Sequence, residues 1–134
     1  MPKHMIQSAA NAYAGLRYAL KTERNIRIFL ATYFLFFLLA LRFSFSAGEW
    51  MIFLLAGGFF VTVELLNTAM ERIADAMDDH CKREHRADCF TAIRHAKDIG
   101  AAASLVSLLV VVLIMLFLFV PYFDVMLSEV WSIR

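Results

Sequence analysis

The sequence has few cysteines and almost no net charge. Its two cysteines, Cys81 and Cys89, lie in one polar segment of the 134-residue chain, which is too few for a disulfide scaffold. The formal net charge is +1, so no bulk basic character indicates a nucleic-acid partner. Residues 1–25 lack a compact apolar core followed by a small-residue cleavage site, so we expect no cleaved secretory signal.

The common motifs of soluble phosphotransferases and hydrolases are also absent from the sequence. It contains no Gly-x-x-x-x-Gly-Lys-[Ser/Thr] loop, no His-Arg-Asp or Asp-Phe-Gly triplet and no Gly-x-Ser-x-Gly elbow. If this chain transfers phosphate, it does not belong to the common soluble kinds of kinase.

Apolar residues are what the sequence has in excess. They make up 61% of the chain, against about 45–50% in soluble domains, which indicates a membrane protein. Three apolar stretches approach the roughly 20 residues that span a bilayer. We predict one all-α domain over 1–134, with membrane spans at 26–45, 50–70 (continuing to about 77) and 99–120.

The remaining segments are polar or amphipathic. Residues 1–25 alternate apolar and basic side chains at helical spacing, which predicts a surface helix in the headgroup plane. The pattern alone favours a plain anchor without chemistry. We expect residues 78–96 to form a polar connection, partly helical, and residues 121–134 to form a short tail beyond the third span.

The positions of the basic residues predict the orientation of the chain. Of the 13 lysines and arginines, only Arg42 and Arg134 lie outside the N-terminal segment and the connection between spans two and three. Basic residues gather on the cytoplasmic side of membrane proteins. We therefore expect a multi-pass protein with a cytoplasmic N-terminus and its dense polar chemistry at the cytoplasmic face.

An acidic stripe follows the second apolar stretch. Glu64, Asn67, Glu71 and Asp75 share one helix face, with Glu64 and Glu71 about 10.5 Å apart along the axis. The deeper Glu64 suits a proton acceptor, because hydrocarbon disfavours its charge. The shallower Glu71 suits a hard cation such as Mg²⁺. A structural polar network between helices is the alternative, but ionisable groups inside a membrane favour function.

Two weaker signals lie at the same expected depth. Lys97 and Asp98 open the third span, where a lysine can contact phosphate and an aspartate can cap the helix or assist a metal; most such pairs are interfacial anchors. Cys81, His85 and Cys89 would share a face of a helix and are of zinc-ligand type. Their spacing matches no familiar zinc site, which favours solvated loop residues.

Three motifs together resemble one known family. They are Glu64-Leu-Leu-Asn-Thr-Ala-Met-Glu-Arg-Ile-Ala-Asp75, Ala96-Lys-Asp98 before a small-residue-rich span, and Ala14-Gly-Leu-Arg-Tyr-Ala-Leu-Lys-Thr-Glu-Arg-Asn25. In order and extent the chain resembles the prokaryotic diacylglycerol kinase and undecaprenol kinase family. The resemblance implies a homotrimeric bundle in the bacterial cytoplasmic (inner) membrane that transfers the γ-phosphate of ATP to a lipid hydroxyl.

The same resemblance implies roles for single residues. Glu64 would be the general base on the lipid alcohol, and Glu23 and Glu71 would hold Mg²⁺. In this family the site is composite, so Glu23 can come from a different subunit than Glu64 and Glu71. The remaining nucleotide and phosphate contacts would come from Asn67, Lys97, Asp98 and Arg17.

The choice of substrate depends on a shorter stretch. Residues 18–27 are more similar to the undecaprenol kinase branch, which implies undecaprenol as substrate and undecaprenyl phosphate as product. A diacylglycerol kinase that makes phosphatidic acid is the alternative within the family. From another class, a small proton-coupled membrane transporter would also explain a carboxylate inside the membrane, and a pure scaffold is a third possibility.

Overall fold

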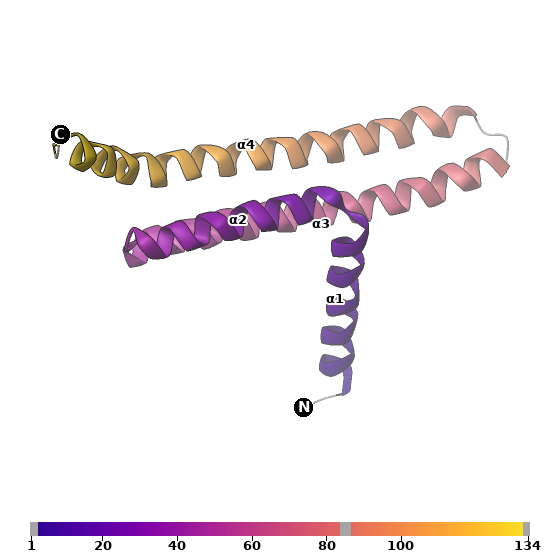
Figure 1. Cartoon of the computed structure of the whole chain (residues 1–134). Helices are drawn as coiled ribbons and strands as arrows, with labels where there is room; N and C mark the ends of the chain where they lie inside the picture. Colours follow the sequence, from indigo (N-terminus) through magenta and orange to yellow (C-terminus); the bar gives the residue numbers. More distant parts are fainter. Residues whose placement is uncertain (1–2, 84–86, 133–134) are drawn as a thin grey trace.

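The described part of the chain folds into four helices, three of which run side by side. The computed structural model describes residues 3–83 and 87–132. In chain order the helices are α1 (Lys3–Thr22), α2 (Arg24–Arg42), α3 (Ala47–Arg83) and α4 (Ala87–Ser132). α3 and α4 form a long antiparallel pair, α2 lies along α3, and α1 projects steeply away from the bundle (Figure 1).

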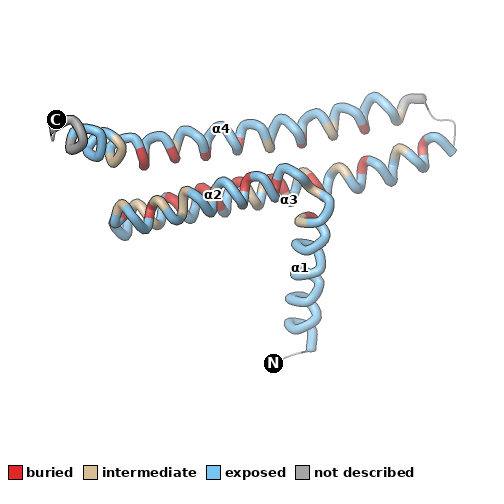
Figure 2. The backbone as a smooth tube through the Cα atoms, viewed as in Figure 1, coloured by how far each residue is buried: buried red, intermediate tan, exposed pale blue. Residues whose placement is uncertain are grey.

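Three of these helices have the dimensions of membrane spans. α2, α3 and α4 are each long and apolar enough to cross a bilayer. α1 has few buried side chains, Ala19 among them, and Figure 2 shows it almost wholly exposed. The predicted all-α membrane fold, with an N-terminal helix and three apolar helices, is therefore confirmed.

Aromatic side chains fill the space between the three apolar helices. Phe53 of α3 is 0% exposed and packs against Tyr33 of α2, with ring centroids 4.4 Å apart. The ring centroids of Phe29 in α2 and Phe60 in α3 are 4.0 Å apart. Buried positions lie on the faces that α3 and α4 turn toward each other (Figure 2). Since lipid tails are as apolar as these rings, close packing rather than dehydration favours the contact.

The turn between α2 and α3 is fastened by Glu49. Its Oε2 accepts hydrogen bonds from the backbone N–H and the hydroxyl of Ser46, at 2.8 and 2.6 Å. This arrangement closes a capping box at the start of α3. Its Oε1 accepts a third bond from the Tyr122 hydroxyl of α4, at 2.7 Å. One carboxylate therefore joins the α2–α3 turn to α4.

The paired glycines of α3 face in different directions. A Cβ at Gly57 would overlap the ring of Tyr33, whereas a Cβ at Gly58 would meet nothing within 4 Å. Gly57 therefore lets α2 and α3 approach closely, and the Tyr33 hydroxyl donates a hydrogen bond to the backbone oxygen of Phe53. Gly58 remains on an open face of the helix.

The polar connection expected at 78–96 is largely helical instead. α3 continues to Arg83 and α4 begins at Ala87. Lys82 and Asp78 form an ion pair one turn apart, at 2.6 Å, which supports the extended α3. Apolar positions within the charged segment, including Ala74, Cys81 and Ile93, form a small buried cluster between the two helices. This cluster explains why the helices stay paired beyond the apolar region.

The last helix extends beyond residue 120, where the third span is expected to end. α4 continues through Pro121 to Ser132. A proline inside a helix lacks one hydrogen-bond donor, but neighbouring helices help membrane helices to tolerate it. Here Tyr122 follows the proline and stacks on Phe43 of the α2–α3 turn, with centroids 5.2 Å apart.

Candidate functional site

The acidic stripe of α3 lies against a second stripe on α4. The two helices are antiparallel, so successive residues of one stripe meet residues of the other in reverse order. The contacts fall at positions i, i+3 and i+11 of α3 and at positions i, i+3 and i+7 of α4, and each of these sets lies on one helix face. The facing pairs are Glu64–Ser104, Asn67–Gly100 and Asp75–Lys97.

Glu64 is the buried end of this arrangement. It is 2% exposed, and its Oε2 accepts a hydrogen bond from the Ser104 hydroxyl. The Thr68 hydroxyl donates a hydrogen bond to the backbone oxygen of Glu64 at 2.9 Å. A buried carboxyl group is costly unless it is hydrogen-bonded. The contact with Ser104 stabilises Glu64 inside the bundle.

Asn67 connects the deep and shallow carboxylates. Its Nδ2 donates to Glu71 Oε1 at 3.1 Å. Its Oδ1 is buried and, among the described residues, has no hydrogen-bond partner. A Cβ at position 100 would overlap that oxygen, so the missing side chain of Gly100 provides the space for it. Asn67 can therefore orient the Glu71 carboxylate.

Glu23 contacts Arg72 of α3, the residue that follows Glu71. Glu23 lies between α1 and α2, and its Oε1 accepts a hydrogen bond from Arg72 Nη2 at 3.1 Å. The Arg72 guanidinium lies 5.6 Å above the Tyr18 ring and 3.9 Å from Asp75. Sequence reasoning gave Arg72 no role, although it directly follows Glu71. It ties the α1–α2 junction to the shallow end of the stripe.

Lys97 and Asp98 lie on different sides of α4. Lys97 Nζ is 2.7 Å from Asp75 Oδ1, beyond the apolar part of both helices. This hydrogen bond lowers the pKa of the Asp75 carboxyl and raises the pKa of Lys97. The Asp98 side chain is 69% exposed, with Arg94 at 3.9 Å. Consecutive helical residues diverge by about 100°, so only Lys97 faces the stripe.

The two donors that were expected to hold Mg²⁺ have the right chemistry but bond to other side chains here, Glu23 to Arg72 and Glu71 to Asn67. Carboxylate oxygens are the ligands that Mg²⁺ favours, and Glu23 and Glu71 supply them. Within residues 3–83 and 87–132, however, no group of three His, Cys, Asp or Glu is close enough to hold a metal. Arg17, expected on the nucleotide side, lies exposed on α1.

The zinc hypothesis gains no support from the described part of the chain. Cys81 is buried in the small cluster with Ala74 and Ile93, and Cys89 packs at its edge. His85 lies outside the described residues. Packing between α3 and α4 accounts for the position of Cys81.

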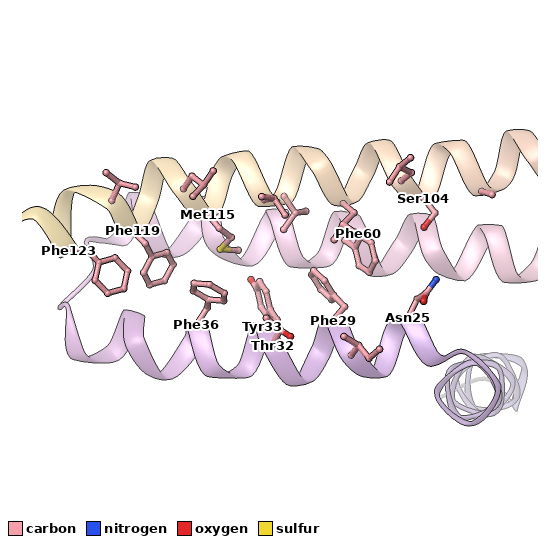
Figure 3. A pocket seen from close by; sticks show the side chains of 18 residues that line it. Asn25, Phe29, Thr32, Tyr33, Phe36, Phe60, Ser104, Met115, Phe119 and Phe123 are labelled. Atoms are coloured by element: carbon pink, nitrogen blue, oxygen red, sulfur yellow. The ribbon is translucent and has the colours of Figure 1, made fainter.

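A groove between α2 and α4 leads to the buried end of the stripe. It has a volume of about 610 Å³, and α3 contributes Phe60 to its wall (Figure 3). Aromatic and aliphatic side chains line most of its length, with Phe36 and Phe119 toward one end. Ser104 and Asn25 lie toward the other end (Figure 3). Ser104 lines the groove, whereas Glu64 does not.

Ser104 is the main site residue that sequence reasoning missed. Its signal was present, because Lys97, Gly100 and Ser104 have the same i, i+3, i+7 spacing as Glu64, Asn67 and Glu71. Gly100 lets the Asn67 side chain of α3 approach α4 closely. Pairing the two stripes needed the antiparallel register of α3 and α4.

Two comparisons with known proteins cover most of this chain. A family model described as prokaryotic diacylglycerol kinase matches residues 10–119, a range that includes both stripes and Glu23. The undecaprenol kinase of Bacillus subtilis (strain 168) is 34% identical over 116 residues, which are 86% of this chain and 87% of the relative. A match of this extent shows family membership.

Proposed function

Because this chain belongs to the prokaryotic diacylglycerol kinase family and is therefore a membrane lipid kinase, we propose that it transfers the γ-phosphate of ATP to undecaprenol. The product would be undecaprenyl phosphate. Diacylglycerol, converted to phosphatidic acid, is the alternative substrate. The name of the Bacillus subtilis relative favours undecaprenol, whereas the family description names diacylglycerol kinase.

The observation that carries this proposal is the position of Glu64. It is a buried carboxyl group beside the polar end of an apolar groove, so a long hydrocarbon chain in the groove would bring its terminal hydroxyl close to a base. Glu64 would accept the hydroxyl proton as the lipid oxygen forms its bond to the γ-phosphorus. The bond from that phosphorus to the β–γ bridging oxygen breaks, and ADP leaves with the electron pair. Phosphoryl transfer depends mostly on such positioning and on charge stabilisation.

The nucleotide and metal would bind at the shallow end of the stripe. Mg²⁺ would neutralise charge on the phosphates, held by Glu71 and by a Glu23. Asn67 supports the metal site because it already orients Glu71. The ammonium of Lys97 could exchange Asp75 for phosphate oxygens. The other proposed nucleotide contacts are Asp98 and Arg17.

A homotrimer would complete this site. Glu23 contacts Arg72 in its own chain, and no three ligands gather among the described residues, so a neighbouring subunit would supply the second metal carboxylate. The open face of α3 supports such an assembly. Gly58 lies in a shallow apolar hollow with Leu54 and Phe59, where a helix of another copy could approach closely.

We further propose a bacterial cytoplasmic (inner) membrane location with a cytoplasmic N-terminus and active site. Basic residues near the polar end of the bundle support this orientation. ATP is available on that side of the membrane, and the shallow end of the stripe would face it.

A competition assay tests the proposed function. Purified protein in lipid vesicles receives Mg²⁺, ATP labelled at the γ-phosphate, and equal amounts of undecaprenol and diacylglycerol. We expect most of the label to appear in undecaprenyl phosphate. A Glu64→Gln protein prepared in parallel should transfer no label to either lipid. Mostly phosphatidic acid would support the alternative substrate. Transfer to neither lipid would contradict the kinase, and proton flux without ATP would then favour a transporter.

A further inference from the structure

The groove and the buried carboxylate do not meet directly. Ser104 lines the groove between α2 and α4, whereas Glu64 does not line it and is 2% exposed. The Ser104 hydroxyl donates a hydrogen bond to Glu64 Oε2. One hydroxyl group is thus shared between the apolar groove and the carboxylate behind it.

We propose that Ser104 relays the proton of the lipid alcohol to Glu64, an inference that rests on the proposed function. The lipid hydroxyl gives its proton to Ser104 Oγ as Ser104 gives its own proton to Glu64 Oε2. The lipid oxygen bonds to the γ-phosphorus, and the bond to the leaving ADP oxygen breaks. After the step, Ser104 is again a neutral hydroxyl and Glu64 carries the transferred proton.

The other hydroxyl groups near Ser104 are engaged elsewhere. The Ser107 hydroxyl, one turn along α4, donates to the backbone oxygen of Ser104 at 2.7 Å. Another polar group of the groove is engaged elsewhere, because the Tyr33 hydroxyl donates to the Phe53 backbone oxygen. A hydroxyl can donate and accept at the same time, so Ser104 can bond to Glu64 while it accepts from a lipid hydroxyl.

Ser107 provides a matched control for a test by substitution. Ser107 is 1% exposed and lies on the same helix, but its hydroxyl bonds to a backbone oxygen and not to Glu64. We expect Ser104→Ala to lower kcat for undecaprenol on the order of 10²-fold, the usual scale of a lost proton-transfer group, without changing KM for ATP. Ser104→Thr should restore most of kcat, and Ser107→Ala should leave it near the wild-type value.

A kinetic measurement separates a relay from a structural role. The reaction rate is measured in mixtures of H₂O and D₂O. Because the relay moves two protons in one step, the wild-type rate should depend on the deuterium fraction along a curve. The rate of Ser104→Ala should depend on it along a straight line. If Ser104→Ala fails to insert, Ser104→Cys, similar in size but a weak donor, serves in its place. Any one of three results would overturn the relay but not the proposed function. They are an unchanged kcat in Ser104→Ala, no recovery of kcat in Ser104→Thr, and a straight line for the wild type. An inactive wild type would overturn the proposed function, and the relay with it.

Discussion

The two glutamates of the stripe have the same side chain in different surroundings. Glu64 is buried and bonded to a serine hydroxyl, whereas Glu71 is half-buried and bonded to an amide. Burial suits a group that accepts one proton from an apolar substrate, and partial exposure suits a group that binds a hydrated cation. The difference in environment, rather than residue type, supports two roles.

Glutamine at each position should separate these roles. Glu64→Gln keeps an oxygen that can accept the Ser104 hydrogen bond but cannot take a proton, so kcat should fall at least about 10²-fold while KM for ATP stays unchanged. Glu71→Gln should raise KM for the Mg²⁺–ATP complex. Steady-state kinetics of both variants checks this. Equal loss of ATP binding in the two variants would contradict the division.

Gly100 offers a second prediction for a single residue. A methyl group there would overlap Asn67 Oδ1, so in Gly100→Ala the amide must turn and lose its bond to Glu71. Hydrogen bonds to charged groups contribute about 1.5–3 kcal/mol, so KM for Mg²⁺–ATP should rise about tenfold or more. Gly48→Ala is the control, because a Cβ at position 48 meets nothing within 4 Å. An unchanged KM in Gly100→Ala would remove Asn67 from the site.

At the scale of elements, two helices extend together past their apolar parts. The buried cluster of Ala74, Cys81 and Ile93 and the Asp75–Lys97 ion pair hold the extensions of α3 and α4 side by side. Both contacts cross between the helices. The extensions therefore depend on each other, and the polar end of the stripe keeps its geometry outside the apolar region.

Asp75→Asn should loosen the first turns of α4. The variant removes the ion pair with Lys97, so amide hydrogen exchange around residues 93–98 should become faster by a small amount, as is usual for exposed pairs. Because Lys97 lowers the pKa of Asp75, the contribution is present above about pH 4 and is lost as the pH falls further. Acid should therefore have the same effect as the substitution.

Asp78→Asn is the matched control for this effect. Asp78 pairs with Lys82 inside α3, so its loss should leave exchange in α4 unchanged. If both aspartates affected α4 equally, general charge would explain the result, and the specific contact between the helices would be rejected.

At the scale of the whole molecule, one chain brings together only part of the proposed site. Glu64, Asn67 and Glu71 follow each other on α3, but Glu23 is held by Arg72 at the α1–α2 junction. A trimer would let Glu23 of one subunit approach Glu71 of another. Such a shared site predicts that two inactive variants can complement each other.

Mixing subunits tests whether the site is shared. Equal amounts of Glu64→Gln and Glu23→Gln subunits, assembled together, should recover about a quarter of the wild-type activity, because each site draws two subunits at random from a symmetric ring. Glu64→Gln mixed with Glu71→Gln should show no activity beyond that of the two separate variants, because both positions lie on the same helix face of one chain. No recovery in the first mixture would contradict a site divided between Glu64 and Glu23.

The sequence by itself determined the helices and the stripe. Hydrophobic length and amphipathic period depend on neighbouring residues, so three apolar helices, a surface helix and the common face of Glu64, Asn67 and Glu71 could be predicted. The limits of the helices were less predictable, because the apolar positions between 74 and 93 are sparse among charges and reveal their role only when α3 and α4 pack together.

Only the tertiary structure decided which residues meet across helices. Ser104 reaches Glu64, Gly100 makes room for Asn67, and Lys97 turns to Asp75 while Asp98 turns away. Each of these outcomes depends on the register and rotation of α4 against α3. Contacts many residues apart along the chain set that register, here through close packing of aromatic and small side chains, and no local pattern contains it.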